Sequence, residues 1–193
     1  MSLKVSPLFL TRGVPGTHDT KLLEKCIKAL KSNKFNKIRI PKFDKSIDDR
    51  SKKSKWFKIH SKPDIVIFEG WCVGAKPQNA NKLKRPVNNL EKFQDKNLIW
   101  RKFVNNNLKT YYKKLFQNIN YFFYLRASSF QQLRSWRIKQ EKKLFFKSKD
   151  KKGLKIMSKD DIINFMQTYQ RITQHMFKET PKNSSIIFNL NSK

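Results

Sequence analysis

The sequence is poor in acidic residues and has no long hydrophobic run. It contains 14 Asp and Glu residues against 44 Lys and Arg residues, so its formal net charge is +30. The longest apolar runs, at residues 65–68, 121–125 and 186–188, are far shorter than the roughly 20 residues that span a bilayer. The first residues also lack the apolar stretch of a signal peptide. We therefore expect a cytoplasmic protein with no membrane partner.

Cysteine and the common catalytic motifs are scarce as well. Cys26 and Cys72 are the only cysteines and have no CxxC spacing. We expect two buried, free thiols in a reducing compartment rather than a disulfide or a metal site. The sequence contains no GxxxxGKS or GxxxxGKT, no GxSxG and no HExxH, and its three histidines have no metal-ligand spacing.

The excess of positive charge allows two interpretations. A basic surface is typical of proteins that bind nucleic acid. However, only nine of the 44 basic residues are Arg, whereas nucleic-acid readers use Arg for bidentate contacts. Lys is abundant together with Asn, Phe and Ile, which indicates a drift in base composition rather than selection for charge. We favour drift and regard nucleic acid as an unlikely partner, although the positive field would attract any phosphate-bearing ligand.

Strands that alternate with helices predict an α/β protein with a mostly parallel sheet. The apolar run at 64–68 is typical of a strand buried in such a sheet, and we expect it to be central with a strand at 121–125 beside it. Thr17 is expected to cap a first helix, and Ser158 with Asp161 predicts a capping box at another. The other expected elements are strands at 37–41 and 186–190, helices at 98–119 and 129–147, a polar excursion at 42–62, and loops at 71–87 and 147–155.

An acidic residue, Glu69, directly follows the predicted strand at 64–68, and Gly70 comes next. The carboxyl ends of strands are the places where open α/β sheets bind ligands. A carboxylate there can hold Mg²⁺ directly or through water, and Mg²⁺ can bridge nucleotide phosphates. The plainer interpretation is a Glu that ends a strand and faces water.

Two closely spaced arginines are informative in a chain where Lys dominates. Arg134 and Arg137 lie three residues apart and share a helix face, where two guanidiniums can form a fork for phosphate oxygens. Arg126 lies just before this helix. The alternative is a solvated face on which Arg137 makes an ordinary i,i+4 ion pair with Glu141.

Two further segments carry polar groups suited to a small ligand. In residues 12–19 (RGVPGTHD), the glycines allow close backbone approach and the following helix N-terminus favours anions. His18 and Asp19 in this segment can orient a hydroxyl or a carboxylate. Residues 44–50 gather acidic groups against a basic background. The alternatives are a capped turn for the first segment and a solvated loop for the second.

Several segments together are similar to the D-glycerate 3-kinase family, which belongs with the uridine kinase, phosphoribulokinase and pantothenate kinase-like P-loop kinases. They run in the family's order within residues 8–178. The segments are TRGVPGTHD (11–19), IPKFDKSIDDR (40–50), DIVIFEGWCVGAKPQ (64–78), PVNNLE (86–91), WRKFVNNNL (100–108) and LRASSFQQLRSWRIKQEKKL (125–144).

The resemblance implies a three-layer, P-loop-kinase-like parallel sheet with helices on both faces, in a single domain over residues 1–193. It implies phosphoryl transfer from ATP to a small hydroxy acid, with D-glycerate as the first expectation. It also implies Mg²⁺ near Glu69, held directly or through water, and a lid over residues 126–155. The implied roles are catalysis by Glu69, Arg134 and Arg137, nucleotide binding by Arg126, Arg134 and Arg137, and substrate binding by Arg12, His18, Asp19, Asp44, Arg50 and Trp71.

The sequence departs from the family at its start. In the family, a first strand, the P-loop and an Asp that activates the acceptor hydroxyl lie upstream of the segment matched by residues 11–19. We therefore expect a sheet that lacks its first strand and P-loop, with apolar surface exposed where that strand would pair. Three interpretations stay open: a kinase fragment or decayed kinase that is inactive alone, the non-catalytic half of a split kinase that needs a separate N-terminal P-loop segment, and a basic nucleic-acid-binding protein.

Overall fold

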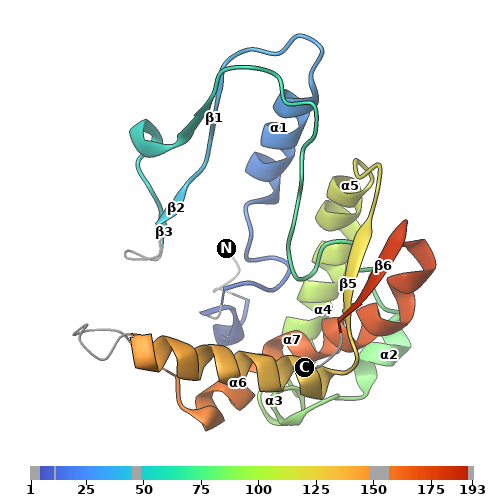
Figure 1. Cartoon of the computed structure of the whole chain (residues 1–193). Coiled ribbons are helices and arrows are strands. Elements are labelled where there is room, and N and C mark those ends of the chain that lie inside the picture. The colour runs from blue at the N-terminus through green and yellow to red at the C-terminus, as the bar shows by residue number, and fades with distance from the viewer. Residues whose placement is uncertain (1–4, 11, 45–48, 148–156, 191–193) are drawn as a thin grey trace. The chain divides into compact units, whose positions relative to one another are not determined.

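The computed structural model describes residues 5–10, 12–44, 49–147 and 157–190 (Figure 1). The chain divides into two compact units. The first, called the core unit here, comprises Met1–His18 and Trp71–Lys193. The second, called the excursion unit, comprises Asp19–Gly70.

Helices and one parallel strand pair make up the core unit. β5 (Phe123–Ala127) and β6 (Ile186–Leu190) lie side by side, with Phe123 opposite Ile186 (Figure 1). Parallel strands need a long crossover connection, which here contains α6 (Phe130–Lys147) and α7 (Lys159–Glu179). The other helical elements are η2 (Pro7–Leu10), α2 (Ala80–Lys84), α3 (Asn89–Phe93), α4 (Ile99–Asn107), the π-helical turn η4 (Leu108–Tyr112), α5 (Lys113–Phe116) and η5 (Pro181–Asn183).

The hydrophobic core of this unit is built on α4 and its π-helical continuation. Trp100, Val104 and Leu108 repeat at four-residue spacing, so they share one helix face, and all three are buried. Side chains of α7 join this cluster, and a second cluster links α6 to α7. The residues concerned are Ile172 and Met176 in the first cluster and Phe130, Ile162 and Met166 in the second.

Short elements make up the excursion unit. α1 (Thr20–Lys31) begins after Asp19, whose carboxylate accepts a hydrogen bond of 3.0 Å from the Leu22 N–H. Among the described residues of this unit, no hydrophobic side chain is buried. Its other elements are β1 (Ile38–Ile40), paired antiparallel with β4 (Phe57–Ile59), β2 (Phe43–Asp44), paired antiparallel with β3 (Asp49–Arg50), and η3 (Lys53–Lys55).

The prediction of a central buried strand at 64–68 is wrong. This segment forms no strand, and Ile65 and Ile67 are 78% and 85% exposed. An extended segment becomes a strand only when another strand supplies hydrogen-bond partners, and no described segment pairs with this one. The strand expected at 121–125 does form, but it begins two residues later as β5, and its neighbour is β6. Within the described residues, the parallel sheet therefore has two strands.

The predicted helices are largely confirmed. Those expected at 98–119 and 129–147 correspond to α4–η4–α5 and to α6, and the capping box of Ser158 and Asp161 is present at α7. Thr17, however, does not cap the first helix; that role belongs to Asp19. The segment 71–87, expected as a loop, contains the short helix α2. The basic loop predicted at 147–155 lies almost entirely outside the described residues.

Both cysteines are free, as predicted. Cys72 is buried and Cys26 is only partly buried. Burial raises the pKa of Cys72 to about 12, so this thiol stays protonated and unreactive near neutral pH. No helix in the described part of the chain is long and apolar enough to cross a membrane.

Candidate active site

The segment 12–18 forms a tight loop that is fixed by its own hydrogen bonds. The Gly13 N–H donates to Thr17 Oγ1 (2.9 Å), and the Thr17 hydroxyl donates to the Val14 carbonyl (2.8 Å). Val14 is fully buried in the core cluster. Thr17 is therefore occupied inside the loop, which explains why it does not cap α1. The loop is an anchored part of the core unit rather than a mobile turn.

Two glycines allow this loop to lie close to the helices. Gly13 has φ +129° and Gly16 has φ +102°, conformations that other residues rarely adopt. A Cβ at Gly16 would lie 2.6 Å from the Phe103 ring on α4, and a Cβ at Gly13 would lie 2.8 Å from the Tyr169 hydroxyl on α7. A larger residue at either position would adopt an unfavourable positive φ and would lie too close to a neighbouring side chain.

Tyr169 of α7 joins the loop to Trp71. The Tyr169 hydroxyl donates to the Arg12 carbonyl (3.1 Å), and Trp71 Nε1 donates to the Gly13 carbonyl (2.7 Å). The rings of Trp71 and Tyr169 meet edge to face, with centroids 4.9 Å apart. Two residues predicted to bind substrate, Arg12 and Trp71, are therefore held at one place by a tyrosine that the sequence analysis did not single out.

Arg137 of α6 reaches the same tyrosine. Its guanidinium lies 6.0 Å from the Phe165 ring centroid, and that ring contacts Tyr169 at 5.0 Å. Burial raises the pKa of Tyr169, and the positive charge of Arg137 opposes this shift, which shows that the two groups are electrostatically close. The structure thus brings Arg137 toward the loop with Arg12 and Trp71.

Arg137 also makes the ion pair expected under the plainer interpretation. Its Nη2 lies 3.0 Å from Glu141 Oε2, and its Nη1 donates to Gln140 (2.7 Å). Glu141 is buried, so the pair holds the guanidinium in place. Arg134 is partly buried on the same helix, and its side chain makes no hydrogen bond or ion pair with any residue that the structure describes. Arg126 is exposed on β5.

His18 ends the loop and contacts the π-helical turn that follows α4. Its Nδ1 forms a short hydrogen bond with the Tyr112 hydroxyl, which also accepts the Gly16 N–H (3.4 Å). Burial, followed by the positive charge of Arg12, lowers the pKa of His18. His18 is therefore neutral at physiological pH.

The remaining predicted residues belong to the excursion unit. Arg50 Nη1 donates to Asp19 Oδ2 at 2.9 Å, and both side chains are largely exposed. The Leu22 N–H, followed by Arg50, lowers the pKa of Asp19. Asp44 lies on β2, opposite Asp49 of β3. Two of the predicted substrate-binding residues, Asp19 and Arg50, are thus paired with each other.

Glu69 is exposed in the excursion unit. Across the described residues, no group of three or more His, Cys, Asp or Glu side chains converges as a metal site. A single exposed carboxylate does not hold a metal by itself. It fits Mg²⁺ only as one ligand beside waters and nucleotide phosphates, which is how kinases usually bind this ion.

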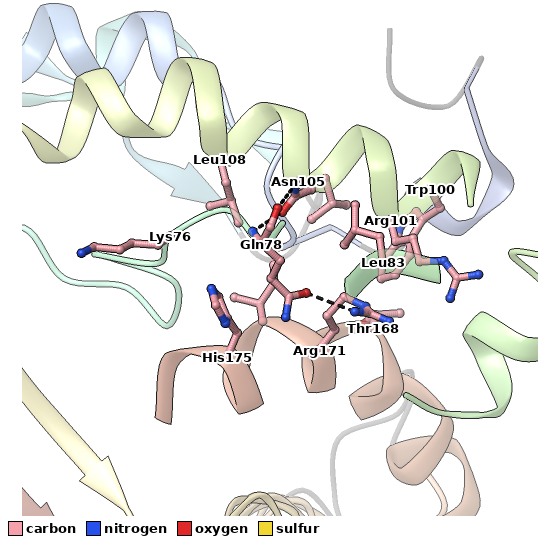
Figure 2. Close-up of a pocket in the computed structure, with 12 residues that line it drawn as sticks. Lys76, Gln78, Leu83, Trp100, Arg101, Asn105, Leu108, Thr168, Arg171 and His175 are labelled. Atoms are coloured by element: carbon pink, nitrogen blue, oxygen red, sulfur yellow. Dashed lines mark hydrogen bonds between the residues drawn. The ribbon is translucent and has the colours of Figure 1, made fainter. Parts of the chain in front are cut away.

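A small cavity lies between α2, α4 and α7 (Figure 2). Its free volume is about 10 Å³, which suits a single water and excludes a nucleotide or a three-carbon acid. Gln78 crosses it and bonds to Asn105 of α4 and to Arg171 of α7. The Gln78 backbone bonds to the Asn105 side chain, and the Gln78 side chain accepts from Arg171, so this residue links α4 to α7 and we interpret the cavity as structural.

Beside the cavity, a buried carboxylate binds two arginines. Glu91, with no exposed surface, accepts hydrogen bonds from Arg101 Nη1 (3.0 Å) and from Arg171 Nε and Nη2 (both 2.6 Å). Asp95 pairs with Arg101 as well (3.2 Å). Asn88 caps α3 by accepting the Glu91 N–H (3.0 Å). The PVNNLE and WRK sequences therefore build a structural ion cluster that sequence reasoning did not identify.

The chain resembles known kinases in sequence, although no protein-family model matches it. It is 33% identical over 178 residues to the uncharacterised kinase mug58 of Schizosaccharomyces pombe, a match covering 89% of this chain and 60% of the relative. It is 24% identical over 180 residues to the chloroplastic D-glycerate 3-kinase of Arabidopsis thaliana, covering 90% of this chain and 37% of the relative. The chain thus spans less than two thirds of the length of these relatives.

The fold is also that of solved kinase structures. D-glycerate 3-kinase from Cryptococcus neoformans var. grubii superimposes with a TM-score of 0.73 at 25% identity, over 97% of this chain and 69% of that protein. A second solved structure, that of the YGR205w protein, superimposes with a TM-score of 0.65 at 23% identity and supports the fold alone. The chain therefore has an α/β kinase fold and is similar in sequence and structure to D-glycerate 3-kinases.

Proposed function

We propose that the chain forms part of an ATP-dependent phosphotransferase that acts on D-glycerate or a similar small hydroxy acid in the cytoplasm. The similarity to D-glycerate 3-kinases supports the reaction class. The observation that carries the proposal for this chain is the convergence of Arg12, Trp71 and Arg137 on Tyr169. The positive charge of Arg137 acts on Tyr169 and that of Arg12 acts on His18 in the same loop, and guanidiniums of this kind are suited to an anionic substrate beside a phosphate group.

The proposed reaction transfers the γ-phosphoryl group of ATP. The acceptor hydroxyl oxygen forms a bond to the γ-phosphorus while the bond from this phosphorus to the bridging oxygen breaks, and ADP leaves with that oxygen. The hydroxyl proton goes to a base, which in the family is an Asp upstream of the segment matched here. Phosphoryl transfer depends mainly on positioning and on charge stabilisation, so the arginines of this chain are suited to contribute.

We assign the residues as follows in this proposal. Arg137 and Arg134, with Arg126, bind the phosphates, and α6 acts as part of a lid over 126–155, of which 148–155 lie outside the described residues. Glu69 is a ligand of Mg²⁺ directly or through water, and the ion neutralises charge on the phosphates. The substrate-binding residues in the proposal are Arg12, His18, Asp19, Asp44, Arg50 and Trp71.

An exposed apolar sheet face supports the proposal of a partner segment. Phe123 and Leu125 of β5 and Ile186 and Phe188 of β6 project on the same face and are 48–63% exposed. The alternate residues, Tyr124 and Ile187, pack into the core. Because parallel sheets are normally covered on both faces, we propose that a strand–P-loop–helix segment, supplied N-terminally or as a separate chain, covers this face. More than a third of the length of the matched relatives has no counterpart here.

The proposal is tested by restoring that segment. The N-terminal region of a matched relative is fused upstream of this chain or co-expressed with it, and ADP release is measured with D-glycerate, L-glycerate and glycerol as acceptors. We expect turnover with D-glycerate only in the complemented protein, with a phosphorylated product visible by ³¹P NMR. A complemented, folded protein that phosphorylates none of these acceptors contradicts the proposed substrate class.

Substitutions test the assigned residues in the complemented protein. Glu69→Gln removes the charge but keeps the shape, and it should lower kcat by orders of magnitude; Asp64→Asn, also exposed, is its matched control. Arg137→Ala should cost about 3 kcal/mol of transition-state stabilisation, comparable to the loss of one well-placed donor. Lys139→Ala, exposed on the same helix, is its control. Near-full activity in both site variants contradicts the assignment.

A further inference from the structure

The Tyr112 hydroxyl has two hydrogen-bond partners in the loop. The Gly16 N–H points to it as a donor (3.4 Å), and His18 Nδ1 is its second partner. Tyr112 itself is buried, which raises the pKa of its hydroxyl, so this group keeps its proton. It ends the π-helical turn, where the Lys113 N–H bonds to the Leu108 carbonyl five residues back. Such turns often occur at functional sites.

The hydrogen-bond partners of this hydroxyl favour one state of the imidazole, the one in which the Tyr112 proton is also used. The Tyr112 oxygen accepts the Gly16 N–H, and its single proton is then available to His18 Nδ1. An Nδ1 that accepts a hydrogen bond carries no proton, so a neutral imidazole must carry its proton on Nε2. Burial and the Arg12 charge both favour the neutral ring.

We infer that Tyr112 is a positioning residue that locks His18 in the Nε2–H tautomer, so that the imidazole donates a hydrogen bond to the ligand. In this tautomer the imidazole presents a hydrogen-bond donor at Nε2, and the positive charge of Arg12 acts on the same ring. Such a pair suits an oxygen anion, and within the proposed function it suits the carboxylate of the hydroxy acid. The inference rests on the proposed function only for the identity of the ligand.

The tautomer is measured directly on the full chain. Long-range ¹H–¹⁵N correlation spectra of protein labelled with ¹⁵N-histidine distinguish Nδ1–H, Nε2–H and doubly protonated rings, and His18→Gln assigns the signal. We expect His18 as Nε2–H at neutral pH in the wild type. Tyr112→Phe should produce a mixture of tautomers. Tyr111→Phe, the neighbouring exposed tyrosine, is the matched control and should leave the His18 signal unchanged.

Two results would overturn the inference about Tyr112. One is a wild-type His18 that carries its proton on Nδ1 or is doubly protonated at neutral pH. The other is a folded Tyr112→Phe variant, verified by circular dichroism, that keeps the pure Nε2–H tautomer. If this variant fails to fold, the wild-type spectrum still decides the tautomer.

Ligand titration tests the carboxylate separately from catalysis. D-glycerate should shift the His18 signal without ATP, whereas glycerol, which lacks the carboxylate, should not. Equal shifts with both, or none with either, contradict the carboxylate assignment and leave the tautomer standing. In the complemented enzyme, Tyr112→Phe should raise KM for D-glycerate about tenfold with little change in kcat, because a charge-assisted hydrogen bond is weakened. Absence of turnover in that enzyme contradicts the proposed function but not the tautomer.

Discussion

The two units of the chain differ sharply in what they bury. All of the buried hydrophobic side chains in the described residues belong to the core unit, together with the ion cluster around Glu91. In the excursion unit, apolar side chains such as Phe57, Ile65 and Ile67 are 56–85% exposed. Burial of apolar surface is the main favourable contribution to folding. We infer from this difference that the core unit contributes most of the free energy of unfolding and that the excursion unit contributes little.

The largest expected effect concerns the buried ion cluster of the core unit. Glu91→Gln leaves Arg101 and Arg171 buried without their shared carboxylate, which should reduce the free energy of unfolding by about 3–5 kcal/mol. Urea unfolding followed by tryptophan fluorescence measures it. In the excursion unit, Glu24→Gln removes the exposed pair with Lys28 and should cost about 0.3 kcal/mol. Equal losses of stability in the two variants would contradict the inference that the core unit contributes most of the free energy of unfolding.

Substitutions of one isoleucine in each unit test how much hydrophobic burial contributes to stability in that unit. Ile162 of α7 is 2% exposed, so Ile162→Ala should cost about 3 kcal/mol through lost burial and the cavity left behind. Ile67 is 85% exposed, and Ile67→Ala should change stability by less than about 0.5 kcal/mol. Thermal unfolding of both variants provides the measurement. A large loss at Ile67 would show that this side chain is buried in solution.

Substitutions of one glycine in each unit test how much stability depends on the backbone conformation at that position. Gly16→Ala forces φ +102° on a residue with a Cβ and brings that atom within 2.6 Å of Phe103, so we expect a loss of about 2 kcal/mol. Gly70 in the excursion unit is exposed and does not have positive φ. Gly70→Ala should therefore be nearly neutral. Urea midpoints of the two variants test this, and a neutral Gly16→Ala would show that the loop is not anchored.

The smallest expected effect is a pH dependence that separates the units. Burial lowers the pKa of His18 and of His175, both in the core unit, below the ordinary value of 6.5. The unfolded chain then binds more protons than the folded one, so stability should decrease as pH falls below 6.5. The lowered pKa of Asp19 acts in another window: its contribution is present above its ordinary value of 3.8 and is lost as pH falls through its lower folded value.

This pH dependence is measured by urea midpoints between pH 8 and pH 3. His18→Gln should flatten the decrease near pH 6 without affecting the change below pH 4, whereas Asp19→Asn should do the reverse. A His18→Gln variant with the wild-type profile near pH 6 would contradict the buried, neutral state of His18.

Local sequence signals predicted the elements whose stability depends on nearby residues. Apolar spacing located α1 and α4, and Ser158 with Asp161 located the start of α7, because helix hydrogen bonds and caps join residues a few positions apart. The strand at 64–68 was predicted wrongly for the opposite reason. Its composition suits a strand, but strand formation depends on a partner strand that is often distant in sequence, and no described segment pairs with it.

By itself, the sequence determined the resemblance to D-glycerate 3-kinases, the order of the main helices and the identity of the candidate charged residues. The tertiary structure decided which of these residues meet. It brought Arg12, Trp71 and Arg137 to Tyr169, paired Asp19 with Arg50, and assigned Glu91 to two buried arginines. The reason is that a hydrogen bond between residues 12 and 169 depends on the packing of separate helices, which no local pattern in a single sequence records.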